Sequence, residues 1–246
     1  MPAGPRGRSL EQVKPVSWDF ATFWTYLFDR DIAIAALVTF VVAAIAQSLA
    51  TVIGFGIAML LAAGPRLAWI ARIYIWAFRG VPPLILLMLF YFGLPQLGLR
   101  LSVLEAGISG LSLYASAYMA EIFRAAFDTI DRGQREAAWS LGYSRFETMR
   151  SILLPQALKI VLPPFGNEFT SMMRTTSLLS VISFEELLRV TTLAINETFR
   201  PFELYSVAAL YYLAMTTGWM LVQQRIERLA ARGEKRGSPA VLTTPH

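Results

Sequence analysis

Polar side chains that could bind a solute stand inside the apolar run at residues 160–183. At about 100° per residue, one stripe of this segment holds an amide, three hydroxyls and a guanidinium: Asn167, Thr170, Ser171, Arg174 and Ser177. A guanidinium binds a carboxylate through two parallel hydrogen bonds, and polar groups are rare in helices that face lipid. The stripe therefore predicts the lining of a polar passage. The alternative is a packing face between helices, on which Ser and Thr bond to their own backbone.

A second group surrounds Glu121, which shares a helical face with Tyr114 and Tyr118. Its carboxylate could contact the amino group of a solute along the same passage. It could instead pair with Arg124, three residues later on the helix.

Arg174 has two interpretations as well, since it could meet a solute carboxylate or pair with an acid on another helix, for which Glu121 is the candidate. Glu168 borders the polar stripe, but it lies six residues and about 240° away on the same helix. The two residues therefore do not pair within that helix.

The composition requires a membrane setting for these residues. The chain has 246 residues, of which 55% are hydrophobic and 16% charged, whereas soluble domains carry about 25% charged residues. Cysteine is absent and the single histidine is His246. These counts exclude a soluble enzyme, a disulfide scaffold and a thiolate metal site, and no metal site is predicted. We expect an all-α integral membrane protein.

Five long apolar runs predict five transmembrane helices. They cover residues 32–65, 80–99, 102–123, 160–183 and 204–224. With the C-terminus in the cytoplasm, the cytoplasmic pieces hold 14 basic residues and the outer pieces hold 7. Basic residues favour the cytoplasmic side. We therefore expect residues 1–31 outside, a transmembrane domain at 32–225, and a cytoplasmic tail without order at 226–246.

The loop at 131–155 is predicted to form two short cytoplasmic helices. Asp131 followed by Gln134 is typical of an N-cap with its partner, and Ser144 with Glu147 repeats the pattern. Gly142 suits the left-handed turn that ends a helix. We expect the first helix at 132–141 and the second to end at Pro155. Helix breaks are also expected at the Pro82–Pro83 and Pro163–Pro164 pairs.

This loop resembles the EAA loop of membrane permease subunits of ATP-binding-cassette (ABC) importers. The match is carried by Glu136, Ala137, Ala138, Gly142, Ile152, Leu154 and Pro155. Further tracts resemble the branch that carries polar amino acids. They are Tyr74-Ile75, Arg79-Gly80-Val81-Pro82, Ala120-Glu121-Ile122-Phe123-Arg124, Gly133-Gln134, Asn167 and Thr176 to Ile182. At Arg174-Thr175 the chain departs from relatives, which often have a lysine followed by an acidic residue there.

The resemblance implies the type I importer permease fold and a multi-pass protein of the inner membrane. It implies a second permease subunit, two ATPase subunits that engage the EAA loop and bind ATP-Mg, and an extracytoplasmic solute-binding protein. The solute would be a polar amino acid. The chain itself lacks the G-x-x-x-x-G-K-[ST] phosphate-binding loop, so we expect no ATPase activity and no cofactor of its own.

Rival functions remain open at this point. The same fold could carry another small polar solute, and an ion-coupled carrier or channel is a further alternative. Six basic residues at 124–159 could also suggest DNA, but a helix tethered at both ends to membrane spans cannot lie in a major groove. We therefore expect lipid and protein partners and no nucleic acid.

Overall fold

The protein is almost entirely helical. The structure, a computed structural model, describes residues 17–235, which contain no strand. In chain order the α-helices are α1 (Phe20–Leu27), α2 (Arg30–Ala62), α3 (Pro65–Gly80), α4 (Pro83–Met88), α5 (Val103–Thr129), α6 (Arg132–Ser140), α7 (Arg145–Thr148), α8 (Leu154–Thr175), α9 (Leu187–Thr198) and α10 (Pro201–Lys235). Two π-helical turns, Leu89–Gly93 and Met149–Leu153, and two 3₁₀ turns, Leu94–Leu97 and Thr176–Ile182, connect some of them.

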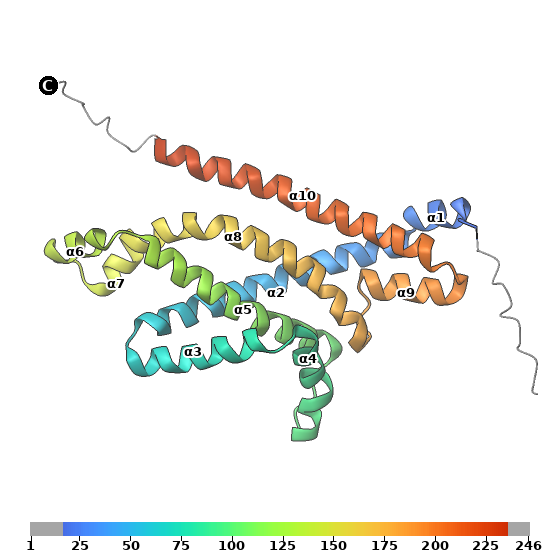
Figure 1. The fold of residues 1–246 in the computed structure, drawn as a ribbon, viewed down its shortest axis with the longest axis horizontal. Coiled ribbons are helices and arrows are strands. Elements are labelled where there is room, and N and C mark those ends of the chain that lie inside the picture. Colours follow the sequence, from blue (N-terminus) through green and yellow to red (C-terminus); the bar gives the residue numbers. More distant parts are fainter. Residues whose placement is uncertain (1–16, 236–246) are drawn as a thin grey trace, which may run out of the picture.

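The long helices α2, α5, α8 and α10 run roughly side by side (Figure 1). The short helices α6 and α7 lie at one end of this bundle, and α1 and α9 lie at the other. The sequence places α6 and α7 in a cytoplasmic loop, so the end with α1 and α9 is the outer end in that orientation.

Helix α2 packs against α5 through small residues, as membrane helices do when their backbones approach closely. Ala46, Ala50 and Ala58 are at most 3% exposed. A Cβ on Gly54 would lie 2.6 Å from the Met119 Cβ and 2.8 Å from the Ser116 carbonyl oxygen. Small residues therefore line the contact between α2 and α5 up to Ala58, and Ala62 at the end of the helix is exposed.

The second predicted span differs from the observed path of the chain. The three arginines of residues 64–79 predict a cytoplasmic loop. These residues instead form α3, which contacts α2 and α5. Pro65–Gly80 and Pro83–Leu97 together make one bent pair, with an angle of 100° between its two halves. The break at Pro82–Pro83 is thus confirmed, and it lies inside the membrane segment instead of at its edge.

Helix α8 is continuous where two breaks were expected. Pro155 lies in its first turn, where the backbone nitrogen needs no partner. Pro163 and Pro164 lie in its interior. Helix α10 binds this region, because Trp219 Nε1 donates to the Gly166 carbonyl at 3.0 Å and Gln223 Nε2 donates to the Pro163 carbonyl at 3.2 Å. The helix breaks predicted at Pro155 and Pro163–Pro164 are therefore wrong.

At the outer end, the buried carboxylate of Glu186 joins two helices. It caps α9 by accepting from the backbone N–H groups of Leu188 at 3.0 Å and Arg189 at 2.8 Å. The Tyr212 hydroxyl on α10 donates to the same carboxylate at 3.0 Å. The Leu187 N–H donates to Thr39 Oγ1 on α2 at 3.0 Å, which fixes the start of α9 between both long helices.

By length and apolarity, two helices can cross a membrane, at Arg30–Ala62 and Pro201–Ala230, and the bent pair raises the number to three. The five predicted spans also need α5 and α8, which carry charged residues. A bilayer accepts such charges where they face protein or water. Helix α10 runs to Lys235, ten residues into the predicted tail, whereas residues 236–246 lie outside the described part of the chain.

Candidate functional site

The predicted coupling loop forms a helix with one exposed edge. Asp131 caps α6 by accepting from the Gly133 N–H at 2.6 Å. The N-cap is therefore confirmed, but the predicted partnership with the Gln134 side chain is not formed, since Gln134 contributes only its backbone N–H to the Asp131 carbonyl. Glu136 and Ala137 are exposed on α6, whereas Ala138 is 1% exposed and holds the helix against the rest of the protein. Glu136 and Ala137 therefore form the part of α6 that a partner could contact.

Gly142 ends α6 as predicted. Its φ is +83°, a left-handed conformation that glycine adopts without steric conflict. The Gly142 N–H donates to the Trp139 carbonyl at 3.0 Å, and the Tyr143 N–H donates to the Ala138 carbonyl at 3.1 Å. This bonding closes the end of the helix in a Schellman motif, so the direction of the chain after α6 is fixed.

The capping box that begins α7 is also confirmed. The Ser144 N–H and hydroxyl both donate to Glu147 Oε2, at 2.8 and 2.7 Å, and the Glu147 N–H donates to Ser144 Oγ at 3.3 Å. The hydrogen bonds from the Ser144 hydroxyl and backbone lower the pKa of Glu147 below its ordinary value. Ile152 and Leu154 pack against the core and Pro155 is exposed, so these EAA residues connect the loop to α8.

The polar stripe on α8 divides into two kinds of residue. Asn167 and Arg174 are exposed, and no ion pair or hydrogen bond engages their side chains within residues 17–235. The hydroxyls of Thr170 and Ser177 donate to their own backbone, at 3.0 and 2.7 Å, and Ser171 is half-buried. Thr170 and Ser177 therefore bond to their own backbone as the packing alternative expects, whereas the place of Asn167 and Arg174 in a passage stays a prediction.

Glu121 does not join this stripe. Its carboxylate accepts from Arg124 Nη2 at 2.8 Å, and Arg124 Nη1 contacts Asp128 at 2.9 Å. The pair with Arg124 is therefore the arrangement observed for Glu121. The suggested pair between Glu121 and Arg174 is not formed, because Glu121 lines a cavity next to α6, at the opposite end of the bundle from η4 (Thr176–Ile182) and α9.

A polar cluster that was not predicted from the sequence lies between α3, α5 and α8. The guanidinium carbon of Arg79 is 5.0 Å from the centre of the Tyr118 ring, a cation–π distance. The Tyr114 hydroxyl donates to the Tyr118 hydroxyl at 3.3 Å. Glu168 on α8 is half-buried, and its charge interacts with Arg79 and Tyr114. The cluster thus holds both signs of charge beside two aromatic rings.

Two features concealed this cluster in the sequence. Arg79 precedes the break at Pro82–Pro83, which indicates a helix end, and a cation at a helix end is expected at the membrane surface. Glu168 only borders the polar stripe of its own helix. The bend of 100° after Gly80 brings the end of α3 against α5, so only the tertiary structure brings Arg79 and Glu168 close together.

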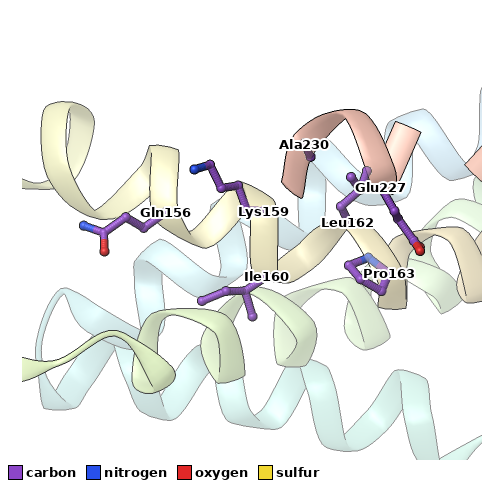
Figure 2. A pocket seen from close by; sticks show the side chains of 7 residues that line it. All are labelled: Gln156, Lys159, Ile160, Leu162, Pro163, Glu227 and Ala230. Atoms are coloured by element: carbon purple, nitrogen blue, oxygen red, sulfur yellow. The ribbon is translucent and has the colours of Figure 1, made fainter. Parts of the chain in front are cut away.

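A separate cavity of about 360 Å³ lies between α8 and α10. Figure 2 shows its seven lining side chains, five from α8 and two from α10, among them Lys159 and Glu227. Neither the polar stripe nor the EAA residues of α6 line this cavity, so it is separate from both candidate sites.

Known proteins resemble this chain over most of its length. Residues 50–232 match the family described as binding-protein-dependent transport system inner membrane component. The probable amino-acid ABC transporter permease protein YckA of Bacillus subtilis (strain 168) is 36% identical over 216 residues, which are 83% of this chain and 95% of that protein. The arginine transport system permease protein ArgU of Corynebacterium glutamicum is 36% identical over 236 residues, which are 89% of this chain and 73% of that protein.

Solved structures agree with these matches. The crystal structure of an amino acid ABC transporter with histidines has a TM-score of 0.80 at 34% identity and covers 87% of this chain and 99% of that one. An inward-facing structure of the MetNI methionine ABC transporter has a TM-score of 0.69 at 18% identity over the same shares, a likeness that concerns the fold alone. The fold is that of a type I importer permease, and the chain belongs to the binding-protein-dependent transport system inner membrane components, the permease subunits of ABC importers.

Proposed function

We propose that this permease forms the transmembrane pathway for polar amino acids, and that ATP hydrolysis on partner subunits drives transport. The polar cluster of Arg79, Tyr114, Tyr118 and Glu168 carries the proposal. The relatives named above as amino-acid and arginine permeases support the same class of solute.

The chemistry of the cluster fits the backbone of an amino acid. Arg79 and Glu168 attract each other, yet they form no direct ion pair or hydrogen bond within the described residues. A zwitterion between them would place its carboxylate on Arg79 and its ammonium group on Glu168, and both contacts are charge-assisted. The rings of Tyr114 and Tyr118 would add a cation–π surface for the ammonium group.

The stripe on α8 would continue this pathway. Arg174 lies six residues beyond Glu168, about 9 Å further along the helix, so it would meet the solute carboxylate at a different stage of passage. Asn167, Thr170, Ser171 and Ser177 would line the route. Arg174 and Asn167 are exposed, and contact of their side chains with lipid would cost free energy. This supports a second permease subunit that covers this face of α8.

The remaining partners follow from the same proposal. Glu136 and Ala137 would dock on an ATPase subunit, with Ala138, Gly142, Ile152, Leu154 and Pro155 holding the helix in place. The ATP-Mg would belong to the two ATPase subunits, and an extracytoplasmic protein would deliver the solute. The twofold bias of basic residues supports an outer N-terminus and a cytoplasmic C-terminus in the inner membrane.

Reconstitution of the permease with its partners into vesicles tests this proposal. Arginine, glutamine and histidine uptake should depend on ATP, and Glu168→Gln and Arg79→Gln should each lower uptake about tenfold or more, the effect of losing one charge-assisted contact. Arg66→Gln, at the start of α3 and away from the cluster, is the matched control. Uptake without ATP would identify a carrier or channel. If only another polar solute stimulated ATP hydrolysis, that solute would be the one transported.

A further inference from the structure

A second cavity, of about 840 Å³, lies between the ends of α2, α3 and α5 and the helices of the coupling loop. Arginines from three elements reach it, namely Arg72 on α3, Arg124 on α5, and Arg135 and Arg145 in the loop. Its acidic lining residues are Glu121 and Asp128. The cavity therefore has an excess of two positive charges.

The distribution of contacts makes this excess available to a ligand. Arg124 already engages both acids, at 2.8 Å to Glu121 and 2.9 Å to Asp128. Within residues 17–235, Arg72, Arg135 and Arg145 have no ion-pair partner. Arg135 donates from Nη2 to the Phe127 carbonyl at 2.9 Å, and its Nε is buried with no hydrogen-bond partner. Three guanidinium groups thus line the cavity without an ion-pair partner among the described residues.

Apart from Thr148, the rest of the cavity wall is apolar. It consists of side chains from the last turns of α2 and α5 and from the π-turn after α7, namely Ala58, Leu61, Ala62, Phe127, Met149 and Leu153. Trp139 on α6, which is 51% exposed, also lines the cavity. Arginines over an apolar wall at the end of membrane-spanning helices match a phospholipid, whose anionic headgroup sits beside its acyl chains.

We propose that this cavity binds an anionic phospholipid through its headgroup phosphate. A carboxylate of a partner protein would satisfy the arginines but would leave the apolar wall and most of the volume unfilled. Arg135 and Trp139 belong to α6, the helix that also carries the exposed Glu136 and Ala137. A bound lipid would therefore hold the coupling helix in place, so that transport per ATP would depend on anionic lipid.

The test uses the complete transporter, which is the permease together with its partner subunits. Lipid is first removed from the transporter, and phosphatidylglycerol or phosphatidylcholine is then titrated in. Bound lipid is counted by native mass spectrometry. The wild type should prefer phosphatidylglycerol at least tenfold. Arg72→Gln/Arg145→Gln should weaken phosphatidylglycerol binding about tenfold, whereas Arg72→Lys/Arg145→Lys should retain most of it. Arg228→Gln removes a charge from exposed α10, outside the cavity, and should change binding less than twofold.

Three outcomes would overturn the proposal. Equal binding of both lipids, or equal loss in Arg228→Gln, would mean that general surface charge attracts the lipid. Displacement of phosphatidylglycerol by millimolar inorganic phosphate, with full coupling in phosphatidylcholine, would identify free phosphate as the ligand. Loss of the ATPase subunits from Arg72→Gln/Arg145→Gln in both lipids would identify a carboxylate of the ATPase. Because lipid binding and subunit assembly do not involve the solute, these two readouts are independent of which solute is transported.

Discussion

The two sides of α5 differ in how they are packed and in the side chains that they present. Toward α2, small residues bring the two backbones together, and Ser116, Met119 and Ala120 are fully buried around Gly54. Toward α3 and α8, the same helix presents Tyr114 and Tyr118 beside charged residues. Lipid gives helices no hydrophobic reason to associate, so close packing must hold the first side together. The second side can then carry polar groups.

The strongest test of this contrast is a side chain added to the packed face. Gly54→Val should lower the melting temperature of the purified permease by many degrees, because its Cβ would overlap Met119 and the backbone of α5. Overpacking of this kind costs about 1–3 kcal/mol. A Cβ on Gly56, two residues later, would meet no neighbouring atom within 4 Å. Gly56→Val should therefore leave the melting temperature unchanged, and equal losses in both variants would show that the seam is not tightly packed.

The coupling loop provides the next largest expected effect. Gly142→Val forces a β-branched residue into a left-handed conformation, at about 1–2 kcal/mol. It should lower solute uptake per ATP hydrolysed several-fold because α6 no longer presents Glu136 and Ala137 at the same angle. Gly98 has a similar φ of +85° and equally open surroundings, but lies in the turn before α5. Gly98→Val should leave the coupling ratio intact. An unchanged ratio in Gly142→Val would remove the coupling assignment.

Arg174→Gln tests the polar side with a smaller effect. We expect an increase of about fivefold in the KM for uptake, with unchanged melting temperature and basal ATP hydrolysis, because one charge-assisted contact is lost and no acid among the described residues forms an ion pair with Arg174. Ser177→Ala is the control, since that hydroxyl bonds to its own backbone, and its KM should change less than twofold. A lower melting temperature in Arg174→Gln would instead indicate a structural ion pair with another subunit.

Local signals in the sequence predicted the coupling loop well. Asp131, Gly142, and Ser144 with Glu147 act within four residues of their own positions, so no knowledge of the fold was needed. The EAA match likewise predicted the family, which the comparisons confirm.

Long-range features were harder to predict. The three arginines of α3 led to the prediction of a loop, although tertiary contacts with α2 and α5 hold these residues as a helix. Proline usually breaks a helix, but a first-turn position accommodates Pro155, and α8 continues through Pro163 where α10 packs against it. Arg79 and Glu168 are 89 positions apart in the chain, and a bend that hydropathy does not reveal brings them together. The polar cluster is therefore a property of the packing.

The smallest expected effect concerns a group outside both sides of α5, the Glu147 carboxylate that caps α7. Its pKa is lowered in the folded protein by the Ser144 hydrogen bonds. A lowered pKa means that the contribution to stability is present above the ordinary value of 4.5 and is lost as the pH falls through the folded-state value. Hydrogen exchange of residues 144–153 should show faster opening in Glu147→Gln than in the wild type at pH 6.5. The difference should disappear once the pH falls below the lowered folded-state pKa, where Glu147 is protonated and resembles glutamine. The exchange of α2 and α5 along their shared seam should be the same in both proteins at each pH, because that contact contains no titrating group. A difference that persists in acid would mean that the size or geometry of residue 147, and not its charge, stabilises the cap.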